Sequence, residues 1–206
     1  MYAIIILLNQ YIGQLLVRQV NGKRLSGFIT ETECYLGTAD SASHTFNGKK
    51  TRRNEPMFME PGTSYVYSIY GMYFCFNISS KEVGSCVLIR SLEPYEGIEE
   101  MHVYRHKHRK ASSKELKTHQ LCNGPSKLCQ ALNISKNCNK INMAESDEFW
   151  VENGSEYASE ENIVVSKRIG IESAGEEAAS KPLRFYLKNN PSVSVRDRKA
   201  EQEMAG

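Results

Sequence analysis

The sequence predicts one domain of the α+β class, built on a largely antiparallel or mixed β-sheet with a protruding hairpin and flanking helices. Segments with the composition of strands follow one another without regular alternation with helices, unlike repeated βαβ units. Two aromatic-rich segments are separated by a tight turn, which is typical of a β-hairpin. The length of 206 residues is enough for a substantial core, so we expect residues 1–206 to form a single domain.

Seven segments are rich in the β-branched and aromatic residues that favour strands. They are residues 14–18, 25–35, 64–69, 72–79, 85–92, 163–171 and 184–188. Tyr70 and Gly71 form the turn between the third and fourth segments. Pro94 is expected to end the fifth strand, because proline cannot donate a sheet hydrogen bond. Residues 37–61 are rich in Asp, Ser, Asn, Gly and Pro, which predicts a long loop.

Two segments have the pattern of helices. Ile98, Met101 and Tyr104 recur at a spacing of three, which predicts a helix over residues 96–110. A second helix is expected to begin at Gly124-Pro125-Ser126, since proline at the first helical position loses no needed hydrogen bond.

The two ends of the chain are less regular. Residues 1–12 form a lead-in whose short apolar run, residues 3–8, fits a core segment better than a signal peptide or a membrane span. Residues 197–206 are strongly charged, and we expect them to fray.

Composition sets few limits on function. The formal net charge of +2 is compatible with nucleic-acid binding but does not argue for it, so any basic surface must come from local clusters. Six cysteines are present without a CxxC pair, which argues against a zinc site. Because several lie in apolar runs, we interpret them as buried, reduced thiols of an intracellular protein. No metal or cofactor is expected.

The alternation of side chains along strands suggests a polar cavity. Residues two apart on a strand point to one face of the sheet. The sets that share a face are Ile29, Glu31, Glu33 and Tyr35, then Tyr65, Tyr67 and Ile69, then Leu88, Arg90 and Leu92. If these strands are neighbours, Glu33, Tyr35, Tyr67 and Arg90 line one cavity. From spacing alone, the alternative is that the tyrosines fill the sheet and Glu33 faces solvent.

Two basic runs stand out. Lys49, Lys50, Arg52 and Arg53 place four positive charges in five residues, which fits either a solvated loop or a phosphate-contacting loop. Residues 105–110 are predicted to form a helix face or the C-terminal end of a helix. A phosphate contact and a nuclear-import patch are the alternatives.

Seven pieces of the sequence, in register, resemble the alkyladenine (3-methyladenine) DNA glycosylase family, the monofunctional alkylpurine DNA N-glycosylases. They are ETECYLG (31–37), ASHT (42–45), RNEPMFMEPGTSYVYSIYGMYFCFNIS (53–79), CVLIRSLEP (86–94), GPSKLCQAL (124–132), RIGI (168–171) and KPLRFYLKNNPSVS (181–194). Each piece alone is modest, but together they cover most of residues 14–198 in the family's order, which makes the resemblance specific.

The resemblance implies a fold like the C-terminal domain of formyltransferases and a role in base excision repair. The expected reaction is hydrolysis of the N-glycosidic bond of 3-methyladenine, 7-methylguanine, ethenoadenine or hypoxanthine after the damaged base is flipped out of duplex DNA. In this family a strand glutamate acts as general base toward a water, which corresponds to Glu33. Arg90 and the backbone carbonyl of Ile169 correspond to the groups that hold this water.

The resemblance also implies how the base and the DNA are held. The flipped base lies between Tyr35 on one side and His44 and Tyr67 on the other, and the Asn77 carboxamide crowds the 2-amino group of guanine. At the hairpin tip Tyr70 enters the minor groove. Its flanking residues Met72 and Tyr73 are expected to touch the DNA, and Lys49, Lys50, Arg52 and Arg53 its phosphates.

Two other functions stay open at this point. One is a non-catalytic module that recognises damaged nucleic acid, and the other is an RNA N-glycosidase. A bifunctional lyase is disfavoured, because no lysine or N-terminal proline falls in the matched active-site pieces. The expected partner is double-stranded DNA with a damaged purine, bound by a monomer that does not engage membranes. The expected location is nuclear, with mitochondrial targeting left open.

Overall fold

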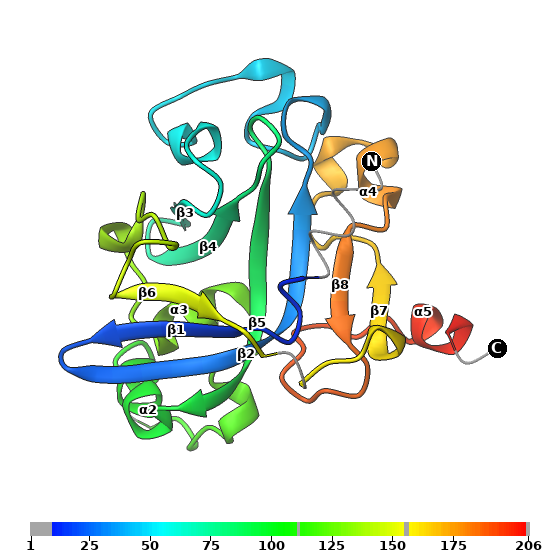
Figure 1. The fold of residues 1–206 in the computed structure, drawn as a ribbon. Helices are drawn as coiled ribbons and strands as arrows, with labels where there is room; N and C mark the ends of the chain where they lie inside the picture. The colour runs from blue at the N-terminus through cyan, green and yellow to red at the C-terminus, as the bar shows by residue number, and fades with distance from the viewer. Residues whose placement is uncertain (1–9, 111, 155–156, 205–206) are drawn as a thin grey trace.

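A curled antiparallel β-sheet dominates the computed structural model, which describes residues 10–110, 112–154 and 157–204 (Figure 1). Its order is β3-β4-β5-β2-β1-β6, while β8 pairs with both β2 and β7. The strands are β1 (Leu15–Val20), β2 (Lys23–Tyr35), β3 (Ser64–Ile69), β4 (Tyr73–Ser79), β5 (Cys86–Glu96), β6 (Phe149–Glu152), β7 (Ile163–Ser166) and β8 (Arg184–Leu187). The long strand β2 is the centre of this arrangement, since it pairs with β1, β5 and β8.

The helices are short and lie around the sheet, which confirms the α+β class. The α-helices are α2 (Ile98–His106), α3 (Pro125–Ala131), α4 (Glu176–Ser180) and α5 (Arg198–Glu203). The 3-10 helices are η1 (Gly37–Ala39), η2 (Phe46–Gly48), η3 (Glu55–Phe58), η4 (Thr118–Gln120), η5 (Lys136–Cys138), η6 (Glu160–Asn162) and η7 (Glu172–Ala174). α3 begins at Pro125, as the sequence predicted, and it packs on β4, β5 and α2.

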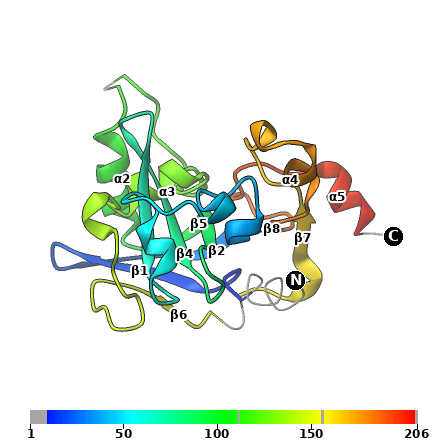
Figure 2. The same ribbon diagram turned by 90° about the horizontal axis from the view of Figure 1, so that it is seen from above.

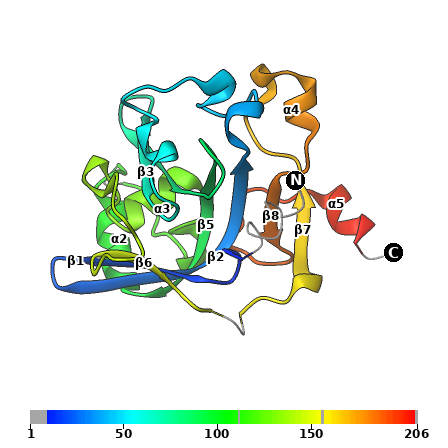
Figure 3. The ribbon, with the colours of Figure 1, turned by 45° about the horizontal axis from the view of Figure 1, so that its top comes forward.

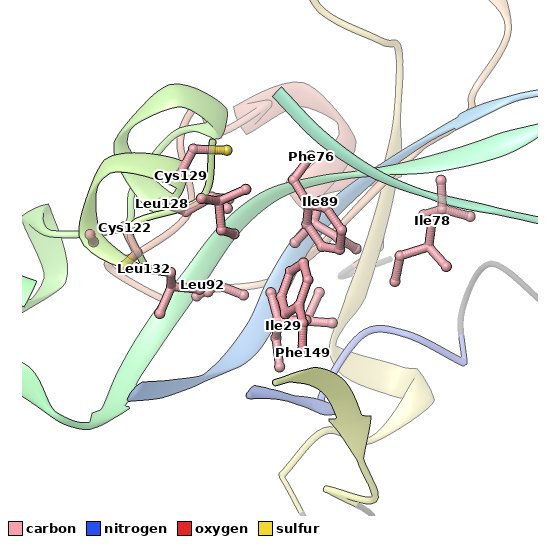
Figure 4. Close-up of a cluster of buried hydrophobic side chains, with 14 of the residues drawn as sticks. Ile29, Phe76, Ile78, Ile89, Leu92, Cys122, Leu128, Cys129, Leu132 and Phe149 are labelled. Atoms are coloured by element: carbon pink, nitrogen blue, oxygen red, sulfur yellow. The ribbon is translucent and has the colours of Figure 1, made fainter. Parts of the chain in front are cut away.

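An apolar core fills the space between the sheet and α3 (Figure 4). Phe76 of β4 and Phe149 of β6 stack at a tilt, with ring centroids 4.7 Å apart. Leu128, Cys129 and Leu132 close the core from the side of α3. Each fully buried aliphatic or aromatic side chain contributes about 1.5–3 kcal/mol to folding. All six cysteines are buried and free, as their apolar neighbours in the sequence indicated.

The prediction that Pro94 ends the fifth strand is wrong, because β5 continues to Glu96. Pro94 pairs with Gly27 of β2, and the register of the two strands shifts between Ser26 and Gly27. A Cβ atom at Gly27 would lie 2.8 Å from the carbonyl oxygen of Glu93, so only glycine allows this close approach. A proline is tolerated in a strand at such an irregularity, since the missing N–H breaks no regular ladder.

A β-bulge also corrects the predicted strand faces. Ile29 and Leu92 do not share a face with Glu33 and Arg90, since both belong to the apolar core. The register of β2 and β5 shifts on both sides of Glu31, and each shift inserts an extra residue that reverses the alternation of side chains. The bulge therefore lets one pair of strands bury apolar side chains along one stretch and charged side chains along the next.

Other predicted boundaries differ at the ends of elements. The helix predicted over 96–110 covers only Ile98–His106, because Gly97 precedes it in the left-handed region with φ +70° and the chain turns after His106. The strand predicted over 163–171 ends at Ser166, where pairing with β8 ends at Arg184. Residues 167–171 instead form a loop that reaches the functional site described below.

The charged C-terminal segment is helical rather than frayed over Arg198–Glu203. The Asp197 side chain caps this helix by accepting a hydrogen bond from the N–H of Ala200 at 3.2 Å. Glu201 is buried and accepts hydrogen bonds from Arg196 and from the Tyr186 hydroxyl, which tie the helix to β8. The core segment predicted at residues 3–8 lies outside the described residues. Within the described ranges, no helix combines the length and apolarity needed to cross a bilayer.

Candidate active site

A cavity of about 440 Å³ opens beside the C-terminal half of β2, which is within the usual size range of small-molecule sites. Figure 3 shows the β2–β3 connection and the segment carrying α4 meeting at this end of β2, where the Ser41 hydroxyl donates to the Ala174 carbonyl at 2.8 Å. The cavity wall includes all seven side chains and backbone segments predicted for catalysis and base binding, namely Glu33, Tyr35, His44, Tyr67, Asn77, Arg90 and Ile169.

Glu33 lies at the floor of the cavity with no exposed surface. Its Oε1 atom accepts a hydrogen bond from the backbone N–H of Ile169 at 2.7 Å. Its Oε2 atom accepts from the Tyr35 hydroxyl at 3.1 Å and lies 3.1 Å from Nη1 of Arg90. The two oxygens are therefore fixed by three donors, and Oε1 keeps an acceptor position next to the cavity-lining loop of Ile169 and Gly170.

The charge state of Glu33 reflects two opposing effects. Burial raises the pKa of Glu33 above its usual value, because a carboxylate loses hydration inside the protein. The positive charge of Arg90 and the hydrogen bonds from Ile169 and Tyr35 act in the opposite direction, but burial is the larger effect. A raised pKa makes a carboxylate a stronger base, which suits a group that takes a proton from water.

A second buried carboxylate, Glu31, holds Arg90 from behind. Nε of Arg90 donates to Oε1 of Glu31 at 3.1 Å, and Nη1 of Arg184 donates to the same oxygen at 3.0 Å. The backbone N–H of Ser194 donates to Oε2 of Glu31 at 2.7 Å. Glu31 is absent from the cavity wall, so it orients Arg90 while Arg90 contacts Glu33. The resulting network runs Glu33–Arg90–Glu31–Arg184.

The Tyr35 ring is supported by a buried ion pair that the sequence reasoning missed. Nη2 of Arg168 lies 2.9 Å from Oδ1 of Asp40 in a two-pronged pair, and both side chains are fully buried. The guanidinium of Arg168 lies over the Tyr35 ring, 4.9 Å from its centroid, and it also donates to the Cys34 carbonyl at 2.9 Å. Arg168 thereby fixes the aromatic wall next to Glu33.

Three further aromatic side chains form another part of the wall. His44 meets the Tyr67 ring edge-on with centroids 4.8 Å apart, and Nδ1 of His44 is hydrogen-bonded to the Tyr65 hydroxyl at 2.8 Å. The surrounding protein and the nearby Arg53 lower the pKa of His44, which favours its neutral form. Because Tyr65 lies buried beneath the pair, it fixes His44 and Tyr67 as one unit.

Asn77 is nearly fully buried in β4, where its carboxamide is oriented by two contacts. Its Nδ2 atom donates to the Tyr65 carbonyl at 3.0 Å, and its Oδ1 atom accepts from the Cys86 thiol at 3.7 Å. These partners fix which end of the amide is the donor, so the side chain has little freedom to turn away from a ligand in the cavity.

The β3–β4 hairpin carries an exposed tip. Tyr70 is 90% exposed and Met72 is 65% exposed, values that contrast with the buried strand residues below them. Both Tyr70 and Gly71 have positive φ, +50° and +73°, and the N–H of Met72 donates to the Ile69 carbonyl at 3.3 Å. Tyrosine is an unfavourable residue at positive φ, since it lacks the freedom of glycine. β4 begins at Tyr73, one residue later than predicted.

The basic loop at residues 49–53 lies beside this hairpin, but its members differ. Lys49, Lys50 and Arg52 are exposed, with Lys50 over the Phe58 ring. Arg53 donates to the Ser68 carbonyl of β3 at 3.1 Å and its guanidinium lies 5.1 Å from the Tyr67 ring centroid. Arg53 therefore contacts the aromatic wall and also contributes positive charge at the surface.

The supporting residues were hidden from sequence reasoning for one reason. Asp40, Arg168 and Arg184 all lie in or near the quoted sequence pieces, but their partners are more than 100 residues away along the chain. Only the folded sheet brings them together. Within residues 10–110, 112–154 and 157–204, no group of three or more His, Cys, Asp or Glu side chains is placed to hold a metal ion.

Comparison with known proteins decides the family. The model of the family described as Methylpurine-DNA glycosylase (MPG) matches residues 6–191. This chain belongs to that family. The match covers β1 to β8 and every residue placed in the cavity above.

Relatives of this chain occur in animals and bacteria. It is 52% identical over 199 residues to the human DNA-3-methyladenine glycosylase, covering 96% of this chain and 66% of the relative. The mouse DNA-3-methyladenine glycosylase is 51% identical, with 95% and 60% covered. A putative 3-methyladenine DNA glycosylase of Clostridium perfringens is 50% identical, with 90% and 91% covered. The chain thus spans less than two thirds of the two mammalian relatives.

Proposed function

We propose that this chain is a monofunctional DNA glycosylase of base excision repair, which hydrolyses the N-glycosidic bond of alkylated or deaminated purines after base flipping. The observation that carries the proposal is a buried carboxylate, Glu33, paired with Arg90 at the floor of an aromatic-walled cavity. The family to which the chain belongs and the names of its relatives support the same reaction. The expected substrates are 3-methyladenine, 7-methylguanine, ethenoadenine and hypoxanthine.

In this mechanism Glu33 takes a proton from the attacking water. The free acceptor position of Oε1 places that water beside the backbone of Ile169, whose carbonyl is expected to help hold it, while Arg90 holds Glu33 on its other oxygen. Departure of the base leaves positive charge on the sugar, which a nearby carboxylate stabilises as in glycoside hydrolysis generally. Glu33 thus acts as general base and as electrostatic partner of the sugar.

The aromatic wall is expected to hold the flipped base. Stacking on an aromatic side chain contributes about 1–3 kcal/mol per base. Tyr35 on one side, with His44 and Tyr67 on the other, would bind alkylated purines with a further advantage, since a cationic base is attracted to the faces of tyrosine rings. The Asn77 carboxamide, fixed by the Tyr65 carbonyl and the Cys86 thiol, is expected to exclude the 2-amino group of guanine.

The hairpin tip is expected to make flipping possible. Extrusion of a base costs a few kcal/mol of stacking and pairing. Tyr70 would enter the minor groove and fill the gap, with Met72 and Tyr73 against the neighbouring bases. Lys49, Lys50 and Arg52 would contact phosphates on the same side. Arg53 would contact both a phosphate and the Tyr67 ring.

The rival functions can be separated by substrate. A binding module has no need for a carboxylate with a raised pKa facing a cavity, and an RNA N-glycosidase has no need for a hairpin that enters a minor groove. The lining residues that the structure describes include no lysine to form the covalent intermediate of a lyase. These features favour hydrolysis in duplex DNA.

The test is base release from duplex DNA containing ethenoadenine or hypoxanthine, compared with structured RNA and undamaged duplex. We expect release from the two damaged duplexes, without strand cleavage, and none from RNA. Release from RNA alone would assign the chain to RNA N-glycosidases. Tight binding to the damaged duplex without release would assign it to non-catalytic recognition.

Three finer proposals accompany this function. We place the fold with the C-terminal domain of formyltransferases, which superposition of an experimental structure would test. The protein is expected to act as a monomer on double-stranded DNA, which light scattering of the complex would check. Its expected location is the nucleus, with mitochondria as the second compartment to examine by fluorescent tagging.

A further inference from the structure

One segment holds the positive charge of the chain and is not used by the proposed mechanism. Residues 105–127, here called the α2–α3 basic segment, contain seven Lys and Arg side chains and one acidic residue, Glu115. The segment therefore carries a formal charge of +6. The remaining residues carry −4, from 19 basic and 23 acidic side chains out of the totals of 26 and 24. A charge concentrated in this way creates a strong local potential.

Most cations of this segment are exposed, and they lack carboxylate partners in the described part of the chain. Lys107, Lys110, Lys114, Lys117 and Lys127 are exposed. None of the ion pairs found in the described part of the chain involves a cation of this segment, whereas the cations of the β1–β2 hairpin and of β8 pair with carboxylates. Fixed positive charges without carboxylate partners are free to meet an external anion.

A buried cation lies beneath this surface. Arg105 is 7% exposed, and it donates to the Gln130 side chain but to no carboxylate in the described residues. Its Nε atom has no hydrogen-bond partner there either. Burial lowers the pKa of Arg105, and burial together with the charge of Arg105 lowers the pKa of Lys127. The strain between these positive charges would be relieved by an anion on the surface above them.

The position of the segment relates it to the hairpin. α3, which begins within the basic segment, packs on β4, and its first residue Pro125 lines the cavity. The loop of Lys49 to Arg53 instead touches β3, through the Arg53–Ser68 contact. The two basic surfaces therefore adjoin different strands of the hairpin, β4 and β3. Figure 2 shows the segment after α2 extending in the same direction as the β3–β4 hairpin.

We propose that the α2–α3 basic segment is a second surface for the DNA backbone, which holds duplex phosphates beside β4, in addition to those that the 49–53 loop would meet beside β3. The inference rests on the proposed function, since it takes duplex DNA as the ligand. With basic surfaces beside both strands of the hairpin that carries Tyr70, the duplex is held at more phosphates than the 49–53 loop alone can meet. The contact reads no sequence and acts on undamaged DNA as well.

Duplex DNA fits this surface better than an acidic protein does. The exposed lysines are spread along the loop rather than gathered in a pocket, and phosphates along a backbone can meet such a spread of charges one by one. The shared side with the hairpin tip also places the segment where DNA must pass if Tyr70 enters it. An acidic protein partner would have no reason to prefer that side.

The test compares two variants with equal loss of charge in the full chain. The first replaces three exposed lysines of the segment, Lys110→Gln, Lys114→Gln and Lys117→Gln together. The control replaces Lys188→Gln, Arg198→Gln and Lys199→Gln, near α5 on the opposite side of the molecule from α2 (Figure 1). The affinity for an undamaged duplex is measured at several salt concentrations, alongside base release from an ethenoadenine duplex at saturating enzyme.

We expect the segment variant to bind undamaged duplex about tenfold or more weakly. The slope of log affinity against log salt should fall by about 0.9 for each lysine that meets a phosphate. The control should match the parent, and base release at saturation should be unchanged in both variants, since neither touches the cavity. Equal slopes and affinities for the two variants would overturn the inference. Absence of base release in the parent would instead overturn the proposed function, and the binding comparison would still stand.

Discussion

The cavity floor and the hairpin tip of this protein differ in burial and in how their side chains are held. At the floor and directly behind it, Glu33 and Glu31 are fully buried, and each of their carboxylate oxygens has a hydrogen-bond partner. At the tip, Tyr70 and Met72 are exposed, and Tyr70 is held in an unfavourable backbone conformation. The floor is ordered before any ligand arrives, while the tip presents apolar surface that only a ligand can cover.

This difference teaches what each region contributes. A group that transfers a proton gains from a fixed environment that shifts its pKa, and fixing it requires burial with matched charges. A side chain that must replace a base in a stack gains from having no partner in the free protein. Changes at the floor should therefore alter the rate of chemistry or the stability, and changes at the tip should alter DNA engagement.

The largest effect is expected from Glu33→Gln. An amide has nearly the same shape but cannot accept a proton from water, so we expect base release to fall by about 10²–10⁴-fold. Binding to lesion DNA should persist. If Glu33 is the general base, the parent is active only while Glu33 is ionised. Because the pKa of Glu33 is raised, lowering the pH should then reduce activity at a higher pH than it would with an ordinary glutamate. Single-turnover release and gel-shift binding across pH separate these effects, and release within about threefold of the parent would place the base elsewhere.

Stability should respond to the same change in the opposite sense. Because the folded state raises the pKa of Glu33, this carboxyl favours folding when protonated, and its contribution declines as pH rises through the folded pKa. A neutral glutamine removes the cost of burying a charge, while Arg90 keeps Glu31 as its carboxylate partner. Glu33→Gln should therefore unfold at the same temperature as the parent or higher at neutral pH, and a clear loss of stability would contradict the raised pKa.

Glu31→Gln should give the converse result. It leaves Arg90 and Arg184 without the carboxylate that they share, and removing one partner of a buried ion pair costs about 3–5 kcal/mol. We expect a large loss in denaturant unfolding, with activity reduced through misplacement of Arg90 but with the acidic limb of the pH profile retained. A stable Glu31→Gln protein that has lost that limb would show that Glu31, not Glu33, is the base.

Glu33 and Glu31 show how much of the site could be predicted from the sequence. Alternation along two separate strands, taken as neighbours, placed Glu33 and Tyr35 of β2 and Arg90 of β5 on one cavity, and the β3–β4 hairpin was predicted within one residue. Alternation failed at Ile29 and Leu92, since a bulge is set by pairing between strands rather than by either strand alone. Partners such as Asp40 and Arg168 could not be matched, because nothing local in the sequence joins residues 128 positions apart.

A smaller effect is expected from Asn77→Ser, at the boundary between the fixed floor and the ligand space. A serine leaves room for an exocyclic amino group, so selectivity for hypoxanthine over guanine should fall by about tenfold, within the range of a single steric contact. Loss of the bond to the Tyr65 carbonyl should cost about 0.5–1.5 kcal/mol of stability. Release of guanine from a G·T mismatch measures the change, with ethenoadenine as the control because it has no 2-amino group. Unchanged selectivity would make Asn77 a structural residue only.

The smallest effect on the protein itself is expected from Tyr70→Asn, which tests the tip directly. Tyr70 adopts φ +50°, a conformation that asparagine tolerates better than tyrosine, and the ring makes little contact with the fold because it is 90% exposed. The variant should therefore gain about 1 kcal/mol in unfolding free energy, since it relieves part of the cost of a non-glycine residue in this region. The same change removes the aromatic wedge, so the flipped population of ethenoadenine in a duplex, read by its fluorescence, should fall.

Met72→Ala is the matched control for Tyr70→Asn. Met72 is also exposed at the tip, but its substitution relieves no unfavourable φ, so it should leave the stability unchanged while reducing flipping less. A stability gain together with a loss of flipping in Tyr70→Asn would show that the strained tyrosine is kept for DNA engagement at the expense of the free protein. If Tyr70→Asn flips the base as well as the parent, the wedge role fails. If it is less stable than the parent, the tip is not strained, and the contrast with the floor loses its physical basis.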